Sequence, residues 1–432
     1  MKKEIQVFKF GGSSVRDADA IRNVTTILTD YKDKSLVIIV SAMGKTTNLL
    51  EKVVNAYFNE TEGAMAHLEE AKKAHYKVMS ELFDIKHEVF GQVNDLFVEI
   101  EWVLEEPVQD SYDYIYDQIV SIGELVSSRI LATFLNQNQL QTALIDARDV
   151  ILTDDTFRDA QVNWEQTKLK AQKEVLPRLE KHSFVLTQGF IASNNENQNT
   201  TLGREGSDYT AAIFSFCLDA VSMSIWKDVP GVLTADPRLF ENVSLINRMS
   251  YKEAIEMTYY GAKVIHPKTI KPLQNKSIPL FVKSFIDPKN EGTMIDGNTD
   301  VIQYPPVVVV ETNQCLLHIS TKDFSFVAER HLSFLFQLFN KHRIKINMMQ
   351  NMAISFSVCV TNTAGRLDQL ITSLETDFNV VMDDQLELIT VRNYKEEMLK
   401  SLIGDKIILF EERIRQTIQM VVKKVEPLRW KT

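Results

Sequence analysis

The chain has 432 residues, of which 44% are hydrophobic and 25% charged, and it contains only 15 glycines and 11 prolines. This composition is typical of a chain that folds throughout, and it excludes collagen-like, low-complexity and mostly disordered proteins. The 48 basic and 58 acidic residues give a net charge of −10, which excludes a general affinity for nucleic acids or anionic membranes. An anionic ligand must therefore be held by a few well-placed cations.

Cysteine usage and hydropathy restrict the protein further. No apolar run approaches the roughly 18 to 20 residues that span a bilayer, so we expect no membrane segment. The three cysteines, Cys217, Cys315 and Cys359, are far apart and stand among apolar residues, which indicates buried, reduced thiols and a cytoplasmic protein. Because no HExxH, CxxC or EF-hand pattern occurs, we predict no metal site built by the protein.

The first 300 residues alternate strand and helix patterns. We predict strands at 5–10, 36–40, 140–145, 183–186 and 220–226, and helices at 18–28, 47–57, after Ser207 and at 251–259. The stretch 60–135 is rich in Ala, Leu, Glu and Lys, which predicts several helices. This order predicts an α/β fold, an αβα sandwich with a mostly parallel central sheet.

The pattern changes at Pro305 and Pro306, where we place a domain boundary. The next residues predict one ferredoxin-like βαββαβ unit, with strands at 314–319, 344–349, 354–361 and 386–391 and helices at 328–342 and 367–378. Its first helix should present one apolar face made by Leu332, Leu335, Phe336 and Phe339. A shorter set follows, a helix at 394–403 and strands at 406–410 and 417–422, which a strand at 307–311 would complete.

The first candidate ligand site is a predicted strand that contains Lys9 and runs into Gly11, Gly12 and Ser13. Two glycines let the backbone turn tightly and expose successive N–H groups to phosphate oxygens, while Lys9 supplies a cation. An ordinary Gly-Gly turn with a solvated lysine is the alternative interpretation.

A second segment, Ser41 to Thr46, ends like a P-loop but has Ile39 where that motif needs a glycine, so we reject a true P-loop. Ser41 and Thr47 are still candidate contacts, because ligands gather at the carboxyl ends of parallel strands.

The third segment is a glycine-spaced loop, 201–208, that runs into a predicted helix. Arg204 offers a planar fork that fits a carboxylate, and Asp208 lies near the helix start, where the dipole keeps it ionised. A charged loop in which Ser207 or Asp208 only caps the helix is the alternative.

Two later segments complete the set. Lys227 and Asp228 follow a predicted strand and open a turn-rich stretch, up to Arg238, that could wrap a nucleotide. Lys263 would be a second cation for the phosphates, whereas His266 precedes a proline and is expected to be a structural turn residue without a catalytic role.

Together and in this order, the five motifs resemble those of the aspartate kinases, which have the amino-acid kinase fold. The resemblance runs from Lys9 to about Pro267, and the following βαββαβ unit and its shorter companion are similar to paired ACT regulatory modules. It implies a catalytic domain over 1–304, with a substrate lobe over about 1–215 and a nucleotide lobe over about 216–304, and a regulatory region over 305–432. The implied reaction transfers the γ-phosphoryl group of ATP to the β-carboxylate of L-aspartate, the first step of lysine, threonine and methionine synthesis, with Mg²⁺ arriving on ATP.

The resemblance also implies roles for single residues. Lys9 would stabilise the transition state, and Asp208 would organise the cations around it. Arg204 would bind a substrate carboxylate and Glu124 the α-ammonium, with Thr47 and Ser207 as hydrogen-bond partners and Phe190 as a wall. The expected ATP contacts are Gly11, Gly12, Ser13, Ser41, Lys227, Asp228, Arg238 and Lys263.

Some features depart from the resemblance or leave alternatives open. Glu205 stands where many relatives have a small residue, and the loop from Thr321 to Phe326 lacks a glycine that lysine-responsive relatives often have. Phe324 and Asn347 are candidate effector contacts, with lysine, threonine or no effector all open. A same-fold kinase of another acid, such as glutamate, and a non-catalytic amino-acid sensor are the alternative functions. Lone sheet edges in the short second module favour a homodimer.

Overall fold

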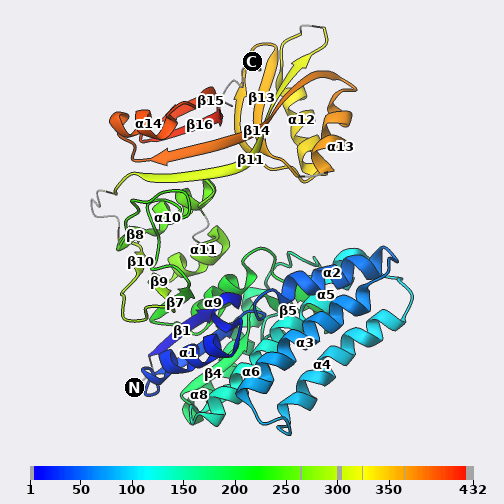
Figure 1. The fold of residues 1–432 in the computed structure, drawn as a ribbon, viewed down its shortest axis with the longest axis vertical. Coiled ribbons are helices and arrows are strands. Elements are labelled where there is room, and N and C mark those ends of the chain that lie inside the picture. The colour runs from blue at the N-terminus through cyan, green and yellow to red at the C-terminus, as the bar shows by residue number, and fades with distance from the viewer. Residues whose placement is uncertain (1–3, 263–264, 299–303, 324, 364, 425–432) are drawn as a thin grey trace, which may run out of the picture. The chain divides into compact units, whose positions relative to one another are not determined.

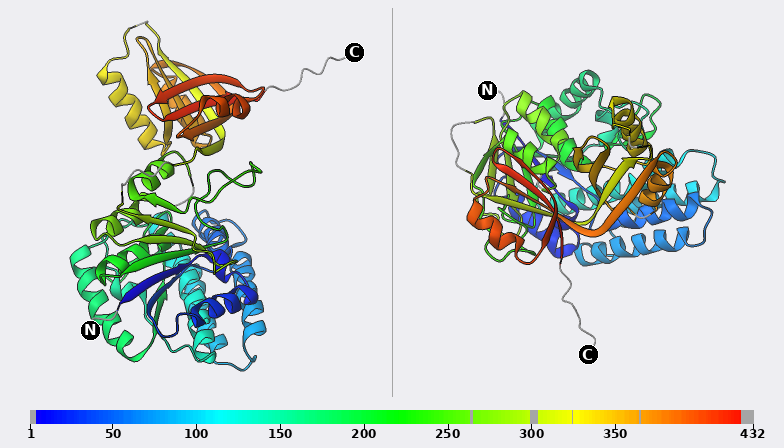
Figure 2. Two further views of the ribbon diagram at one scale, coloured as in Figure 1. Left: turned by 90° about the vertical axis from the view of Figure 1, so that its left-hand side faces the viewer. Right: turned by 90° about the horizontal axis from the view of Figure 1, so that it is seen from above.

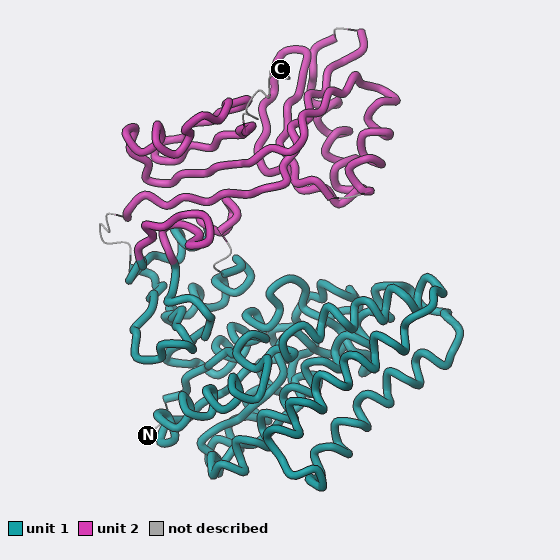
Figure 3. The backbone as a smooth tube through the Cα atoms, viewed as in Figure 1, with its two compact units in different colours: residues 1–232, 245–255, 263–302 teal, residues 233–244, 256–262, 303–432 magenta. Residues whose placement is uncertain are grey.

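The structure, a computed structural model, describes residues 4–262, 265–298, 304–323, 325–363 and 365–424. The chain divides into two compact units, shown in different colours in Figure 3. Unit 1 comprises residues 1–232, 245–255 and 263–302, and unit 2 comprises residues 233–244, 256–262 and 303–432. Two stretches before Tyr304 therefore belong to the unit that holds the C-terminal sheet. The domain and lobe boundaries expected from the sequence stay a prediction.

Unit 1 is built on an eight-stranded sheet in the order β3-β4-β2-β1-β7-β9-β10-β8 (Figures 1 and 2). All neighbouring strands from β3 through β9 are parallel, and β10 runs antiparallel to β9. The mostly parallel sheet predicted from the sequence is thus confirmed. The strands are β1 (Ile5–Phe10), β2 (Ser35–Val40), β3 (Thr142–Leu144), β4 (Phe184–Gln188), β7 (Ser222–Lys227), β8 (Arg248–Ser250), β9 (Leu280–Ser284) and β10 (Thr293–Asp296). A separate hairpin pairs β5 (Ile191–Ser193) with β6 (Asn199–Thr201).

Helices cover both faces of this sheet (Figure 2). The helices of residues 4–298 are η1 (Gly12–Val15), α1 (Ala18–Thr29), α2 (Thr46–Phe58), α3 (Ala64–Leu82), α4 (Val89–Glu105), α5 (Tyr112–Val120), α6 (Ile122–Gln137), α7 (Ala147–Val150), α8 (Trp164–Lys181), α9 (Gly206–Cys217), α10 (Tyr251–Tyr259), which is divided between the two units, and α11 (Pro267–Asn275). Phe10 of β1 and Ile38 of β2 share one apolar cluster with α1 to α6. Val7 and Ile39 point the other way and are equally buried, and α9 contacts β1 and β2. Burial on both faces explains why these strands read as continuous apolar runs.

The helical stretch Tyr112–Gln137 is apolar and long enough to cross a membrane. Of its most apolar window, 83% is buried inside the structure, as in the core helix of a globular domain. The side chains of Ile119, Val126 and Ile130 lie in the same apolar cluster as the sheet. The apolar character of α5 and α6 is therefore explained by the core of unit 1.

Unit 2 contains an antiparallel sheet in the order β12-β13-β11-β14-β16-β15. Its elements are β11 (Val307–Thr321), α12 (Glu329–Lys341), β12 (Ile346–Asn351), β13 (Ser355–Thr361), α13 (Arg366–Leu374), β14 (Phe378–Arg392), α14 (Glu396–Ile403), β15 (Ile407–Ile414) and β16 (Thr417–Lys423). The βαββαβ order over β11 to β14 is the one predicted.

The sequence-based assignment of the last strand of this module was wrong. The helix predicted to reach Phe378 ends at Leu374, and the strand runs from Phe378 to Arg392. Its first half pairs with the second half of β11 and completes the first module, while its second half pairs with 307–311 and with β16. The two long strands therefore serve both modules, and the pairing of 307–311 with the second module is confirmed.

The predicted apolar face of α12 is correct at Leu335 and Phe339, which are buried against β11 and β13. Phe336 is 41% exposed instead, with its ring centre 6.0 Å from that of Phe356 in an edge-to-face arrangement. The helix therefore meets the sheet with a narrower stripe than the four apolar positions suggest. In the second module, Phe240 from the stretch 233–244 packs on the apolar cluster around Ile389, which places that stretch in unit 2.

Candidate active site

Four neighbouring strands of unit 1 end at the same edge of the sheet, because they are parallel and in register. Phe10 of β1 lies beside Val40 of β2 and Trp226 of β7, and Val40 lies beside Gln188 of β4. The residues at and next to these ends include Lys9, Ser41, Phe190 and Lys227. Segments that are distant in sequence are thus brought to one place, as expected for ligand sites in open α/β sheets.

Lys9 and Asp208 form the ionic centre of this edge. The Lys9 Nζ lies 2.7 Å from the Asp208 Oδ1, and both side chains are nearly buried. Asp208 stands in the first turn of α9, where the helix dipole favours an anion. Burial alone would raise the pKa of Asp208, but the Lys9 ammonium and the Lys227 side chain overcome this effect and hold that pKa below its ordinary value. Asp208 is therefore ionised, and it holds the Lys9 Nζ near the end of β1.

Glu124 is the second buried carboxyl group of the site. It stands in the first turn of α6, and its Oε1 accepts a hydrogen bond from the Ala42 N–H at 3.2 Å. Its Oε2 is buried and has no hydrogen-bond partner among the described residues. Burial raises the pKa of Glu124 to about 8, although the Ala42 amide and Lys9 act in the opposite direction. This oxygen can accept a hydrogen bond from a bound cation.

These groups line one pocket of about 500 Å³ in unit 1. Nine residues expected from the sequence lie around it: Lys9, Ser41, Thr47, Glu124, Phe190, Arg204, Ser207, Asp208 and Lys227. The structure thus brings together every residue for which we predicted a catalytic or substrate-binding role. A pocket of this size accepts a small polar ligand.

Five further lining residues were not expected from the motifs as ligand contacts: Tyr116, Arg158, Gly203, Glu205 and Gly206. The two glycines belong to the loop already identified, and their spacing was a usable signal. Tyr116 and Arg158 belong to no motif, since one comes from a helix and the other from a loop between two predicted strands. Sequence reasoning had no means to place them here.

Glu205 has a defined structural role. Its backbone is left-handed, with φ 54°, and its Oε2 accepts a hydrogen bond from the His266 N–H at 2.8 Å. His266 in turn caps α11, because its Nδ1 accepts from the Lys268 N–H at 3.2 Å. Partial burial lowers the pKa of His266. His266 thus has a structural role as the N-cap of α11, and Glu205 links the loop after β6 to the start of α11.

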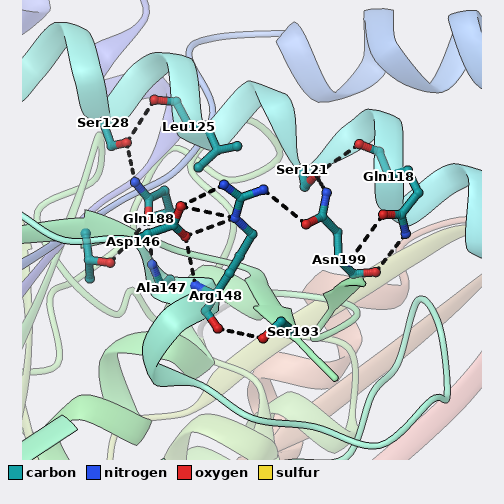
Figure 4. A network of polar contacts seen from close by, with 11 residues as sticks. Gln118, Ser121, Leu125, Ser128, Asp146, Ala147, Arg148, Gln188, Ser193 and Asn199 are labelled. Carbon is teal, nitrogen blue, oxygen red and sulfur yellow. Dashed lines mark hydrogen bonds and ion pairs between the residues drawn. The ribbon is translucent and has the colours of Figure 1, made fainter. Parts of the chain in front are cut away.

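A polar network links β4 and β6 to the helices α5 and α6 (Figure 4). The Arg148 guanidinium donates three hydrogen bonds to the Asp146 carboxylate, and the Arg148 Nη1 donates to the Asn199 Oδ1 at 3.1 Å. Gln118 and Asn199 exchange two hydrogen bonds, which fix β6 to α5. Gln188 accepts from the Ala147 N–H and donates to Ser128 of α6. The segment that carries Phe190 and the loop after β6 are therefore fixed to α5 and α6.

Gly12 shows how closely two of the loops approach each other. The Gly44 N–H donates to the Gly12 carbonyl at 3.1 Å, and a Cβ atom at position 12 would lie 2.7 Å from the Ala42 carbonyl oxygen. No side chain fits there, so Gly12 is required for packing. A Cβ atom at the neighbouring Gly11 would instead meet the Lys9 Nζ at 3.4 Å, which is ordinary van der Waals contact.

We expect the Gly12→Ala variant to lose about 1 to 3 kcal/mol of unfolding free energy, because the added methyl group overpacks the two loops. The matched control is Gly91→Ala on α4, where a Cβ atom meets nothing within 4 Å. That variant should gain about 0.5 to 1 kcal/mol, since alanine favours the helix over glycine. Urea denaturation of both variants measures this difference, and equal stability of the two would contradict the close packing at Gly12.

The remaining predicted ATP contacts are more dispersed. Ser13 stands in η1 directly after β1, and Asp228 follows β7. Arg238 lies in unit 2, where its guanidinium pairs with Asp236 at 2.6 Å. Lys263 lies outside the described residues.

Of the two predicted effector residues, the structure describes only Asn347. Asn347 on β12 donates hydrogen bonds to the Gln314 Oε1 and the Thr361 Oγ1, at 2.8 and 2.9 Å, and Phe324 lies outside the described residues. A second pocket of about 400 Å³ in unit 2 is lined by Lys322, His331 and other residues, but not by Asn347. Asn347 is therefore engaged within the sheet, and its role as an effector contact stays a prediction.

Comparisons with known proteins agree with this geometry. The sequence profile of the amino acid kinase family matches residues 4–284. Lysine-sensitive aspartokinase 3 of Escherichia coli is 32% identical over 365 residues, which cover 83% of this chain and 79% of that protein. The crystal structure of E. coli aspartokinase III in complex with aspartate and ADP, in the R-state, has a TM-score of 0.82 at 28% identity and covers 97% of this chain and 96% of that one. The structure of the same protein with lysine and aspartate, in the T-state, has a TM-score of 0.80 at 27% identity, with the same coverage.

The profile match covers more than half of the chain, and the E. coli relative is matched over most of its own length. The fold class and the resemblance expected from the sequence are thereby confirmed. The mostly parallel sheet, the charged pocket at its edge and these similarities lead to one conclusion: the chain belongs to the amino acid kinase family and, within it, to the aspartokinases.

Proposed function

We propose that the pocket of unit 1 is the site at which this aspartokinase transfers the γ-phosphoryl group of ATP to the β-carboxylate of L-aspartate, giving 4-phospho-L-aspartate and ADP. The observation that supports this assignment most is the buried Lys9–Asp208 ion pair, which lies in one pocket with Arg204 and Glu124. The charges of these groups are complementary to those of a bound aspartate and of a phosphoryl group during its transfer.

The reaction itself demands little covalent chemistry from the protein. A carboxylate is already a nucleophile, so no base has to remove a proton from it. The obstacle is the approach of two anions and the charge that spreads over the moving phosphoryl oxygens. Lys9 is suited to neutralise that charge, since Asp208 holds its ammonium at the strand end at 2.7 Å. Asp208 is a positioning residue that acts through the cation.

Aspartate presents two carboxylates and one ammonium, and each has a complementary group in the pocket. In this proposal Arg204 binds the α-carboxylate, and the unpartnered Oε2 of Glu124 binds the α-ammonium. Thr47 and Ser207, both in first turns of helices, donate hydrogen bonds to the substrate. Phe190 forms the apolar wall and limits the room around the substrate carbon chain.

The nucleotide is proposed to lie across the strand ends. Gly11, Gly12, Ser13 and Ser41 would face the phosphates with their N–H and hydroxyl groups, and Lys227 would add a cation. Asp228, Arg238 and Lys263 stay predicted ATP contacts. No cluster of three or more His, Cys, Asp or Glu that could hold a metal occurs among the described residues. The residues therefore fit a Mg²⁺ ion that ATP brings with its own phosphate oxygens as ligands, where it would neutralise phosphate charge.

The wider setting is proposed from coarser observations. The three cysteines are buried and none forms a disulfide, which fits a reducing compartment such as the cytoplasm. The sheet of unit 2 ends in the edge strands β12 and β15, which favour pairing with a second copy in a homodimer. We also propose that unit 2 binds an amino-acid effector such as lysine or threonine.

The assignment predicts that the protein, given MgATP, L-aspartate and hydroxylamine, forms aspartyl hydroxamate, because hydroxylamine traps the acyl phosphate. The same assay with L-glutamate distinguishes an aspartate kinase from a kinase of the longer acid. Repeating the aspartate assay with added lysine, threonine or methionine identifies the effector. A folded protein that forms no hydroxamate would contradict the assignment. In that case, calorimetry that shows amino-acid binding but no MgATP heat would indicate a non-catalytic sensor.

A further inference from the structure

Arg158 lines the substrate pocket but belongs to none of the motifs that identify the family. It lies in the loop between α7 and α8, and its backbone is left-handed, with φ 67°. This conformation is costly for a residue with a side chain, and glycine adopts it freely. An arginine at such a position indicates that neighbouring groups hold the backbone there.

Asp117 is the group that holds this backbone. Its Oδ2 accepts hydrogen bonds from the Arg158 N–H at 2.9 Å and from the Thr201 N–H at 2.8 Å, and its Oδ1 accepts from the Thr201 hydroxyl at 2.7 Å. Asp117 is fully buried on α5 and does not line the pocket. Burial raises the pKa of Asp117 to about 6, although these hydrogen bonds act to lower it. One carboxyl group therefore ties the loop of Arg158 to the end of β6, and the loop that follows β6 carries Arg204, the other arginine that lines the pocket.

The guanidinium of Arg158 is held in a fixed position on the pocket wall. It lies 4.3 Å from the ring centre of Tyr116 and 5.3 Å from that of Tyr112, and its Nη1 lies 3.1 Å from the Asp113 Oδ1. Tyr116 is fixed in turn, since its hydroxyl donates to Glu51 at 2.9 Å. A guanidinium has five N–H donors, and the contact with Asp113 uses one of them. The side chain is 37% exposed, so further donors are accessible from the pocket.

We propose that Arg158 is a second substrate-binding arginine, which holds the α-carboxylate of aspartate together with Arg204, and that Asp117 is the positioning residue for both. This inference rests on the proposed function. The α-carboxylate is the group concerned, because the β-carboxylate is the nucleophile and a guanidinium bound to it would withdraw the charge that attacks phosphorus. Two guanidinium forks on one carboxylate reject substrates in which that group is an uncharged amide.

The main test is the Arg158→Gly variant, because glycine accepts φ 67° without strain and the variant should fold. Loss of a charge-assisted contact should raise KM for L-aspartate roughly 10- to 100-fold. KM for ATP and kcat should change less than about threefold, because the nucleotide and the reacting atoms are not touched. Arg158→Lys keeps a charge but loses the planar fork, so its KM should lie between those of the wild type and the glycine variant.

The specificity test compares L-aspartate with its α-amide in the hydroxamate assay. The wild type should prefer aspartate strongly by kcat/KM, and Arg158→Gly should reduce this preference by about the factor by which KM for aspartate rises. The matched control is Arg178→Ala, which removes an arginine that pairs with Glu174 on α8 and does not line the pocket, and which should leave both substrates unchanged. Asp117→Asn should raise KM for aspartate but not for ATP, and by a smaller factor in the Arg158→Gly background than in the wild type.

The inference is overturned if Arg158→Gly leaves KM for aspartate within about twofold of the wild type, or if it weakens aspartate and the α-amide by the same factor. It is likewise overturned if KM for ATP rises as much as KM for aspartate. Failure of the proposed function gives a different result, because the wild type itself would then form no hydroxamate from aspartate.

Discussion

Replacing Lys9 by alanine should lower kcat by about 100- to 1000-fold, a far larger change than in the affinity for aspartate. The reason is that the Lys9 ammonium interacts with charge that develops only when the phosphoryl group moves. The proposed contacts of the bound aspartate come from Arg204, Glu124 and their neighbours, which the variant leaves in place. Steady-state kinetics with the hydroxamate assay gives kcat, and calorimetry gives the aspartate affinity.

The same substitution should also destabilise the fold. Without Lys9, the carboxylate of Asp208 is left nearly buried without its 2.7 Å partner, a loss of about 3 to 5 kcal/mol in unfolding free energy. The double variant Lys9→Ala/Asp208→Asn removes both charges and should recover most of this stability but none of the activity. Equal losses of kcat and of aspartate affinity in the single variant would contradict the role given to Lys9.

The affinity for aspartate should rise with pH between about 6 and 8, because Glu124 must lose a proton to bind an ammonium group. In the unliganded protein burial raises the pKa of Glu124 to about 8, so the carboxyl group is mostly neutral at pH 7. A bound α-ammonium favours the carboxylate and lowers that pKa, so binding releases a proton. Below pH 8, KM for aspartate should therefore increase by up to about tenfold for each unit that the pH falls.

The effect on stability has the opposite sign. Between about pH 4.5 and 8 the folded protein keeps the Glu124 proton that the unfolded chain has lost, so this group contributes less stability as the pH rises. Its contribution is complete below the unfolded pKa and is lost as the pH passes the folded pKa. Thermal unfolding of the unliganded protein at several pH values measures this slope, with the isosteric Glu124→Gln variant as the reference.

In Glu124→Gln, KM for aspartate should be roughly 10- to 100-fold higher and independent of pH over the same interval, while KM for ATP stays close to that of the wild type. The amide cannot titrate, so both pH slopes attributed to Glu124 must disappear in this variant. A wild-type KM for aspartate that is flat from pH 6.5 to 8 would show that Glu124 does not bind the ammonium.

The local elements were predictable because their signals are local. The strand at Ile5–Phe10 and the helix at Tyr251–Tyr259 begin and end as expected, since apolar runs and helical periodicity extend over whole elements. The division of the long strand from Phe378 to Arg392 between two modules was not predictable. One half of this strand pairs with β11 near Thr321, and the other half pairs with β16. This division depends on the long-range register of the strands, which a continuous run of strand-forming residues does not reveal.

In the candidate site, too, residues with a local sequence signal were predictable and residues defined by long-range contacts were not. Residues in glycine-marked segments, such as Lys9 and Arg204, were identified because tight turns next to charged residues leave a sequence signature. Arg158 and Asp117 were missed, because a single arginine in a loop and a single aspartate in a helix look like any surface charge. Only the hydrogen bond between the Asp117 carboxylate and the Arg158 N–H distinguishes them.

The amino-acid sequence was sufficient to identify the chemical groups of this protein: which cations and carboxyl groups it has, on which kinds of element they stand, and which family they resemble. The tertiary structure decided which of these groups meet, because parallel strands in register bring their carboxyl ends to one edge regardless of separation along the chain. It also decided their electrostatic state. The free energy of an ionised group depends on its burial and on its neighbours, so Glu124 and Asp208, two carboxyl groups of one pocket, have pKa values shifted in opposite directions.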